Sequence, residues 1–230
     1  MEKGSAKTGI AIAAIVALVI GGGVGYAAGM GMDNNQNDSG SMSVSENQPN
    51  TSTKAADLRT TMNNLLREHV SASLDVTRDI ADGDEEARMG SMAAQTANAV
   101  AIAGAVGSIY GEEAEAQITD MFVEHITASN EYAEAVQAGD DAAKNAAQEE
   151  LDEYLVEISQ FFSGAISTLP QDTVFILLSE HETLLNQSVV AYNEGNFERS
   201  YELEREALTQ VSGIADALSK GIVETQADKF

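Results

Sequence analysis

Three histidines are the residues of this chain best suited to chemistry, and they are evenly spaced. The 230 residues include only His69, His125 and His181, with 56 positions between each and the next. A glutamate precedes every one of them. Such regular spacing predicts a single structural unit written three times, with the histidine at the same place in each copy.

Metal binding is the chemistry that this pattern most directly indicates. Three neutral imidazoles, completed by a water molecule, suit zinc or copper. The preceding glutamates are candidate additional ligands or hydrogen-bond partners of the imidazoles. Neighbouring residues on a helix point about 100° apart, so each glutamate would serve the histidine of another helix more easily than its own. The candidate metal residues are His69, His125 and His181, and, as weaker candidates, Glu68, Glu124 and Glu180.

A structural layer is the alternative interpretation of the same histidines. A buried histidine that is hydrogen-bonded to a carboxylate or a carbonyl can fix the register of packed helices. Duplication would copy such a residue just as faithfully. The chain has neither the Glu-x-x-His pair of ferritin-like diiron proteins nor a His-Glu-x-x-His sequence. Both interpretations therefore remain open at the level of the sequence.

The elements that must position the histidines are helices. From Ala55 onward, apolar residues recur at steps of three and four, which predicts amphipathic helices and no strands. Fourteen positions after each histidine comes a glycine followed by Asp or Asn, a pattern typical of a helix end and the N-cap of a return helix. The sequence therefore predicts an all-α up-down bundle of six helices, built from three repeated α-hairpins over residues 58–111, 112–166 and 171–223.

Equal distances from the turns place the three histidines at similar depth in this bundle. Each lies about 21 Å before its turn, at 1.5 Å per residue. If the histidine-bearing helices pack around one axis, their imidazoles can converge.

The first 32 residues predict a cytoplasmic tip and a transmembrane anchor. Residues 8–32 carry no charge and include a strongly apolar run long enough to cross a bilayer. Lys3 and Lys7 precede this run, and Asp33 and Asp38 follow it. The positive-inside rule then places the N-terminus in the cytoplasm and the remainder outside the plasma membrane, either extracellular or periplasmic. A cleaved signal peptide is the alternative.

Two further features belong to this N-terminal part. Gly21, Gly25 and Gly29 are four positions apart, a spacing that favours a homodimer in the membrane, although glycine is also simply common in membrane helices. Residues 33–54 are polar and without periodicity, so we expect a flexible linker between the anchor and an acidic domain over 55–230.

Composition narrows the classes of function. A net charge of −25 disfavours nucleic acid as a partner, and the absence of cysteine excludes disulfides and thiolate metal sites. We found no phosphate-binding loop, dinucleotide fingerprint or nucleophile elbow, so the sequence does not predict an enzyme. The acidity fits a cell surface or a high-salt environment. These observations predict a membrane-tethered module that binds a protein or glycan partner; the alternative is a metal-binding or metal-sensing bundle.

Several segments resemble an uncharacterised family of exported bacterial helical proteins. Its repeated Leu-x-x-x-His boxes resemble residues 65–70, 122–126 and 178–182, and its Tyr-Gly and Ala-Gly-Asp turns resemble 110–111 and 138–140. The likeness covers about residues 58–230 and implies export. Members carry a tryptophan in the fourth helix and a further histidine near position 207 or 208, and this chain has neither. The label copper amine oxidase, which some members carry, has no support in these residues.

Overall fold

The computed structural model describes residues 53–230, and this part of the chain is all-α. It contains six α-helices and one short 3-10 helix, with no strand between residues 53 and 230. The elements are α2 (Lys54–Asp82), α3 (Glu85–Tyr110), α4 (Glu112–Ala138), α5 (Asp141–Ala165), α6 (Gln171–Asn193), α7 (Phe197–Thr225) and η1 (Ala227–Lys229). The predicted six-helix bundle is thus confirmed. The predicted anchor, its glycines and nearly all of the linker lie outside the described residues.

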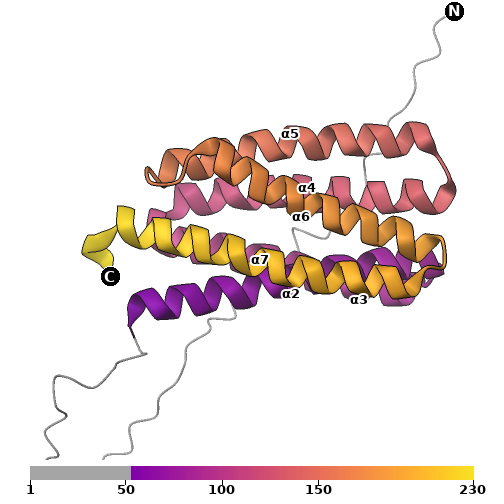
Figure 1. The fold of residues 1–230 in the computed structure, drawn as a ribbon, viewed down its shortest axis with the longest axis horizontal. Coiled ribbons are helices and arrows are strands. Elements are labelled where there is room, and N and C mark those ends of the chain that lie inside the picture. Colours follow the sequence, from indigo (N-terminus) through magenta and orange to yellow (C-terminus); the bar gives the residue numbers. More distant parts are fainter. Residues whose placement is uncertain (1–52) are drawn as a thin grey trace, which may run out of the picture. The chain divides into compact units, whose positions relative to one another are not determined.

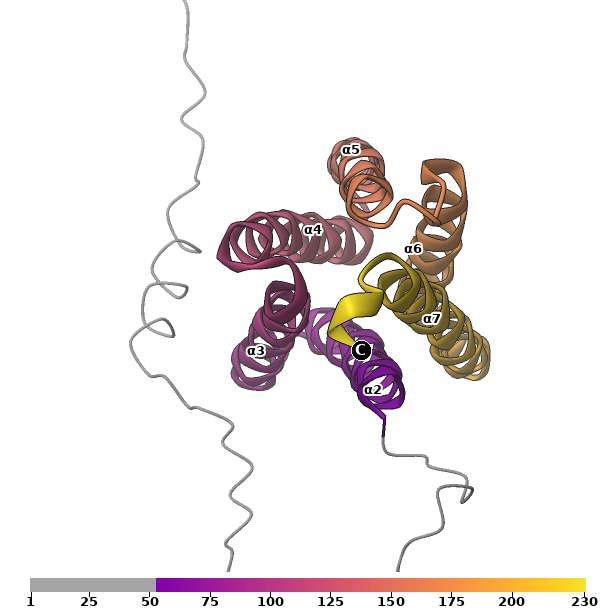
Figure 2. The same cartoon turned by 90° about the vertical axis from the view of Figure 1, so that its left-hand side faces the viewer.

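The three helices that carry the histidines form the inner part of the bundle. Helices α2, α4 and α6 contact one another in all three pairings. The other three helices cover the seams: α3 lies against α2 and α4, α5 against α4 and α6, and α7 against α6 and α2. Consecutive helices run in opposite directions (Figures 1 and 2). The histidine-bearing helices therefore run in the same direction around one axis.

Glycine turns end the three inner helices, as the sequence predicts. Gly83, Gly139 and Gly195 have φ angles of 68°, 66° and 75°, a left-handed conformation that glycine adopts without a Cβ clash. The next residues begin the return helices. The side chains of Asp84, Asp140 and Asn196 accept hydrogen bonds from backbone amides in the first turn of α3, α5 and α7.

The two connections between hairpins also lie where the sequence places them. Gly111, with φ 97°, separates α3 from α4. Helix α5 ends at Ala165, and Pro170 precedes the first residue of α6. Proline is tolerated at this position because a residue at the start of a helix donates no intrahelical hydrogen bond, so its missing amide hydrogen costs nothing there.

The apolar core is divided into a larger and a smaller cluster. The larger includes Met62, Phe122 and Ile158, and the smaller includes Val76 and Leu151, nearer the glycine turns. Burial of one such side chain contributes about 1.5–3 kcal/mol.

Helix α3 is the most apolar of the helices within residues 53–230. By length and composition it is the one among them that could cross a membrane. In the bundle it packs against α2 and α4.

Candidate functional site

The structure brings the three predicted histidines together in the core. The ring centroid of His69 lies 5.5 Å from that of His125 and 5.9 Å from that of His181. Their exposed fractions are only 3%, 3% and 5%, respectively. We call these three side chains the histidine cluster. It forms because equal spacing from the turns places one residue of each inner helix at the same depth.

Each ring of the histidine cluster has a nitrogen without a hydrogen bond. Within residues 53–230, the buried Nδ1 atoms of His69, His125 and His181 have no hydrogen-bond partner. A buried polar atom left in this way costs about 1–3 kcal/mol. A ligand bound at the cluster would satisfy all three of these nitrogens at once.

Aromatic side chains pack against two of the rings. The ring of Tyr154, on α5, stacks on His125 with 4.5 Å between centroids and 17° between planes. The ring of Phe122, on α4, presents edge contacts to His69 and His125 at 5.6 Å and 6.2 Å. The rings thus lie in a mostly apolar surrounding that excludes water.

Burial keeps the three imidazoles neutral. It lowers the pKa of His69 to about 4, against a smaller raising effect of Asn98. It lowers the pKa of His181 to about 3, with a further contribution from His69. The pKa of His125 lies well below its ordinary value, first through burial and then through His69 and His181. Neutral imidazole is the form that coordinates a metal, so no proton has to leave these rings near pH 7.

A carboxyl group not predicted from the sequence reaches the cluster. Glu182, on α6, is 4% exposed, and its Oε1 atom lies 3.5 Å from the Nδ1 atom of His125. Burial, and then the charge of Asp152, raise the pKa of Glu182 to about 8. A neutral acid therefore faces a neutral imidazole at pH 7, and the pair is not a salt bridge.

The three glutamates predicted as weaker candidates lie elsewhere. Glu68, Glu124 and Glu180 are exposed, and the structure does not bring them into the cluster. The buried carboxyl group comes instead from the position after a histidine. Val70 and Ile126 are buried at this position in the first two hairpins, and Glu182 is buried there in the third. A glutamate at a position that is apolar in the other two hairpins is the sequence signal that could have identified it.

Two ring separations in the cluster are close to those around a shared metal ion. Imidazoles whose nitrogens lie about 2.1 Å from one tetrahedral zinc have ring centroids about 5 Å apart, and His69 lies 5.5 Å from His125 and 5.9 Å from His181. Across residues 53–230, however, no three His, Cys, Asp or Glu side chains are arranged to hold a metal ion. Binding would therefore require a rearrangement at the cluster.

A second set of buried polar side chains lies one helical turn closer to the glycine turns. The Gln95 amide donates to the Ser73 hydroxyl at 3.3 Å, and the Asn130 amide donates to the Gln95 carbonyl oxygen at 3.2 Å. We call these three residues the amide layer. Its hydrogen bonds join α2, α3 and α4, which is what a layer that fixes helix register requires.

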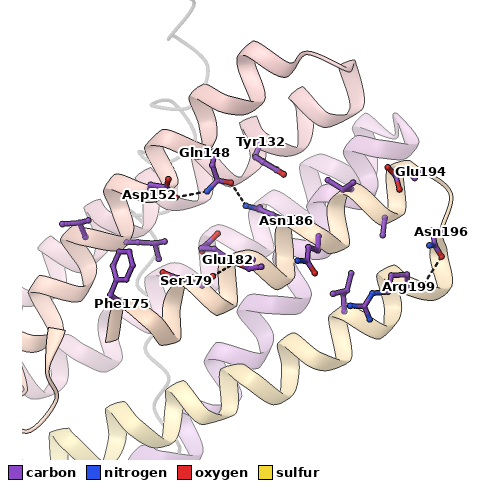
Figure 3. Close-up of a pocket in the computed structure, with 17 residues that line it drawn as sticks. Tyr132, Gln148, Asp152, Phe175, Ser179, Glu182, Asn186, Glu194, Asn196 and Arg199 are labelled. Carbon is purple, nitrogen blue, oxygen red and sulfur yellow. Dashed lines mark hydrogen bonds between the residues drawn. The ribbon is translucent and has the colours of Figure 1, made fainter. Parts of the chain in front are cut away.

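A groove of about 730 Å³ opens between α5, α6 and α7 on the surface above Glu182. Figure 3 shows side chains of α5 facing those of α6 across it. We call it the α5–α6 groove. Its lining includes Gln148, Asp152, Phe175, Ser179, Glu182 and Arg199.

No protein-family model matches the chain, and no curated protein or solved structure matches it at a significant level. The resemblance to a family of exported helical proteins stays a prediction.

Proposed function

We propose that the helical domain binds a transition-metal ion, Zn²⁺ or Cu²⁺, through His69, His125 and His181. The observation that carries this proposal is the convergence of three buried imidazoles, each with an unpartnered Nδ1 atom. Imidazole nitrogens suit both ions. A bound metal would replace the missing hydrogen bonds and offset the cost of leaving these atoms unpaired.

Glu182 would support this site from beside His125. Its Oε1 atom is already the nearest carboxylate oxygen to the His125 ring nitrogen, at 3.5 Å. A nearby dication favours the ionised carboxylate, so metal binding would release the proton of Glu182. The carboxylate oxygen beside the His125 Nδ1 atom would then be in position to serve as a fourth ligand.

The experiment is metal-dependent melting of the full-length chain, purified without a polyhistidine tag and freed of metal by a chelator. A ligand present at about 100 times its Kd adds about 2.7 kcal/mol to the free energy of unfolding. For a domain of this size that corresponds to a rise in Tm of roughly 5–10 °C. Because the chain has no other histidine and no cysteine, adventitious binding by those residue types is excluded.

The matched variants are His125→Ala and Glu124→Gln. The first removes a ring from the histidine cluster; the second changes an exposed neighbour on the same helix. The proposal expects one equivalent of metal and a Tm rise in the wild type and in Glu124→Gln, and neither in His125→Ala. Unchanged melting of the wild-type chain with both Zn²⁺ and Cu²⁺ would reject it.

A surface-tethered interaction module is the second proposal. The observation that favours it is exposed apolar surface at the start of α6, where Phe175 and Ile176 are 36% and 65% exposed. The full-length product should then sediment with membranes and resist an alkaline wash, and a protease added to intact cells should remove the domain. A shortened product in the soluble fraction would reject the tether.

A further inference from the structure

The α5–α6 groove runs along most of one face of α6. The α6 residues that line this face recur at steps of three and four, which places them on one side of the helix. They are Phe175, Ser179, Thr183, Asn186 and Val190. From the first to the last, at 1.5 Å per residue, the open face is about 22 Å long, or about four helical turns. Figure 3 shows Phe175 toward one end of the groove and Glu194 toward the other.

Apolar side chains are exposed on both sides of this groove. Val156, on α5, and Phe175, on α6, line it and are 49% and 36% exposed. Ile176, the neighbour of Phe175, is 65% exposed. Apolar side chains that share one concave surface indicate a face that another molecule covers.

The charge around the groove is acidic. Helix α6 has no Lys or Arg, and the Lys144 side chain, the only cation of α5, donates to Asp141 at 2.9 Å. Arg199 lines the groove, but its guanidinium donates to two glutamates of α7. Asp152 and Glu194 are exposed acidic lining residues. A basic partner complements this surface, whereas a second copy of the chain, at a net charge of −25, is repelled.

The helical walls of the groove favour a helix as its occupant. An extended peptide needs partners for its backbone amides and carbonyls, and between residues 53 and 230 there is no strand whose edge could supply them. A helix satisfies its own backbone groups and presents side chains at i, i+3, i+4 and i+7 to a groove. The open face accommodates about four turns of such a helix.

We infer that the α5–α6 groove binds a basic amphipathic helix of a partner protein. Apolar side chains of that helix would contact Val156 and Phe175, and its Lys or Arg side chains would lie near Asp152 and Glu194. This inference names the kind of partner for the interaction module proposed above and rests on that second proposal. It requires neither a bound metal nor the membrane tether.

The test is a fluorescence-anisotropy titration of the full-length protein, free of metal, with three labelled peptides. Each has about 18 residues, long enough to span the open face as a helix. The first carries Leu on one helix face and Lys on the other. The second has Glu in place of every Lys, and the third has the composition of the first in a scrambled order.

The matched variants are Val156→Lys in the groove and Val100→Lys on α3. The two wild-type side chains are 49% and 46% exposed, and Val100 does not line the groove. Both substitutions add one positive charge at similar exposure. Their comparison therefore separates docking in the groove from general attraction to an acidic protein. Circular dichroism reports the folding of each variant.

The expected result is saturable binding of one Leu/Lys peptide per chain, with the other two peptides at least about tenfold weaker. Val156→Lys should weaken the Leu/Lys peptide by about tenfold or more, because a charged side chain then faces both an apolar contact and the lysines of the peptide. Val100→Lys should stay within about twofold of wild type, since a single exposed charge contributes little. If Val156→Lys loses helicity, Thr183→Lys, which adds the same charge at an exposed lining position, should weaken binding in its place.

Three results would overturn the inference: no saturable binding of the Leu/Lys peptide, equal binding of the scrambled peptide, or equal weakening by the lysine substitutions in the groove and at Val100. A dimer in sedimentation equilibrium that Val156→Lys separates into monomers would also overturn it, because the occupant would then be a second copy. All of these results concern the groove, whereas failure of the tether is seen only in membrane fractionation.

Discussion

Two sets of polar side chains are buried in the same bundle, one turn apart along α2, and they differ in how their hydrogen bonds are met. In the amide layer, Gln95 joins Ser73 and Asn130 through hydrogen bonds across three helices, and the Asn130 Oδ1 atom is left without a partner within residues 53–230. In the histidine cluster, the Nδ1 atoms of all three rings have no hydrogen-bond partner within residues 53–230. The amide layer joins three helices directly, whereas the proposed role of the histidine cluster is to leave nitrogen atoms that a metal ion can bind.

The largest expected effect is the pH dependence of the metal-free protein. Folded His69 and His181 have pKa values of about 4 and about 3, and His125 is also lowered. Below about pH 6.5 the unfolded chain therefore binds protons that the folded chain does not, and stability falls as the pH falls. Each such proton contributes about 1.4 kcal/mol per pH unit.

Glu182 makes the stability of the folded protein depend on pH in the opposite direction. Its folded pKa is about 8, above its ordinary value of 4.5. Between these values the folded chain holds a proton that the unfolded chain has lost, so stability falls as the pH rises through 8. Urea unfolding from pH 5 to 9, with chelator present, should show a maximum near pH 6.5. A profile that is flat from pH 6.5 to 8 would contradict this prediction.

A substitution in the amide layer should lower the free energy of unfolding more than a substitution in the histidine cluster. Gln95→Leu leaves Ser73 and Asn130 without a buried partner, at about 1–3 kcal/mol for each. His69→Leu removes an unpartnered nitrogen and should be neutral or stabilising in the metal-free protein. Urea unfolding of the two variants at pH 7 compares them directly. Equal destabilisation by both would mean that the two layers have the same role.

Glu182→Val gives the third hairpin the residue that the first hairpin has at this position, Val70, and so tests what the buried carboxyl group contributes to stability. The change removes a buried carboxyl group with an unpartnered oxygen, and we expect roughly 1–2 kcal/mol of stabilisation at pH 7. The gain should increase toward pH 9, because the wild-type group is then ionised in the core. The measurement is urea unfolding at both pH values; a loss of stability at pH 9 would show that the buried carboxylate is favourably paired.

The smallest effect is expected for Glu124→Gln. Exposed positions away from specific contacts change stability by about 0.5 kcal/mol or less. Metal affinity should also be unchanged, because the carboxyl group lies outside the cluster. Isothermal titration with Zn²⁺ measures this affinity. A weaker affinity in the variant would indicate that the glutamate before a histidine is a metal ligand after all.

Much of the fold, and half of the site, could be predicted from the sequence. The apolar periodicity and the glycine turns determine the helices and their ends. The equal spacing of His69, His125 and His181 from those turns places the rings together once the inner helices surround one axis. These are local signals that repeat in the chain, so a single sequence displays them.

The remainder of the site depends on differences between the hairpins. The regular glutamate before each histidine pointed to Glu68, Glu124 and Glu180, whereas Glu182, which breaks the pattern, is the one buried. Tyr154 comes from an outer helix, whose sequence shows no comparable regularity. The α5–α6 groove depends on how closely neighbouring helices pack. No local sequence pattern indicates that distance, so the groove could not be predicted.

X-ray absorption of the zinc-loaded full-length protein shows whether the histidine cluster holds a metal. We expect three imidazole nitrogens at about 2.0–2.1 Å from zinc, with the characteristic outer-shell scattering of the rings. This signal should disappear in His125→Ala, which is expected to lose the bound equivalent of metal. A zinc shell made only of oxygen atoms in the wild-type protein would contradict the claim and leave the metal on surface carboxylates.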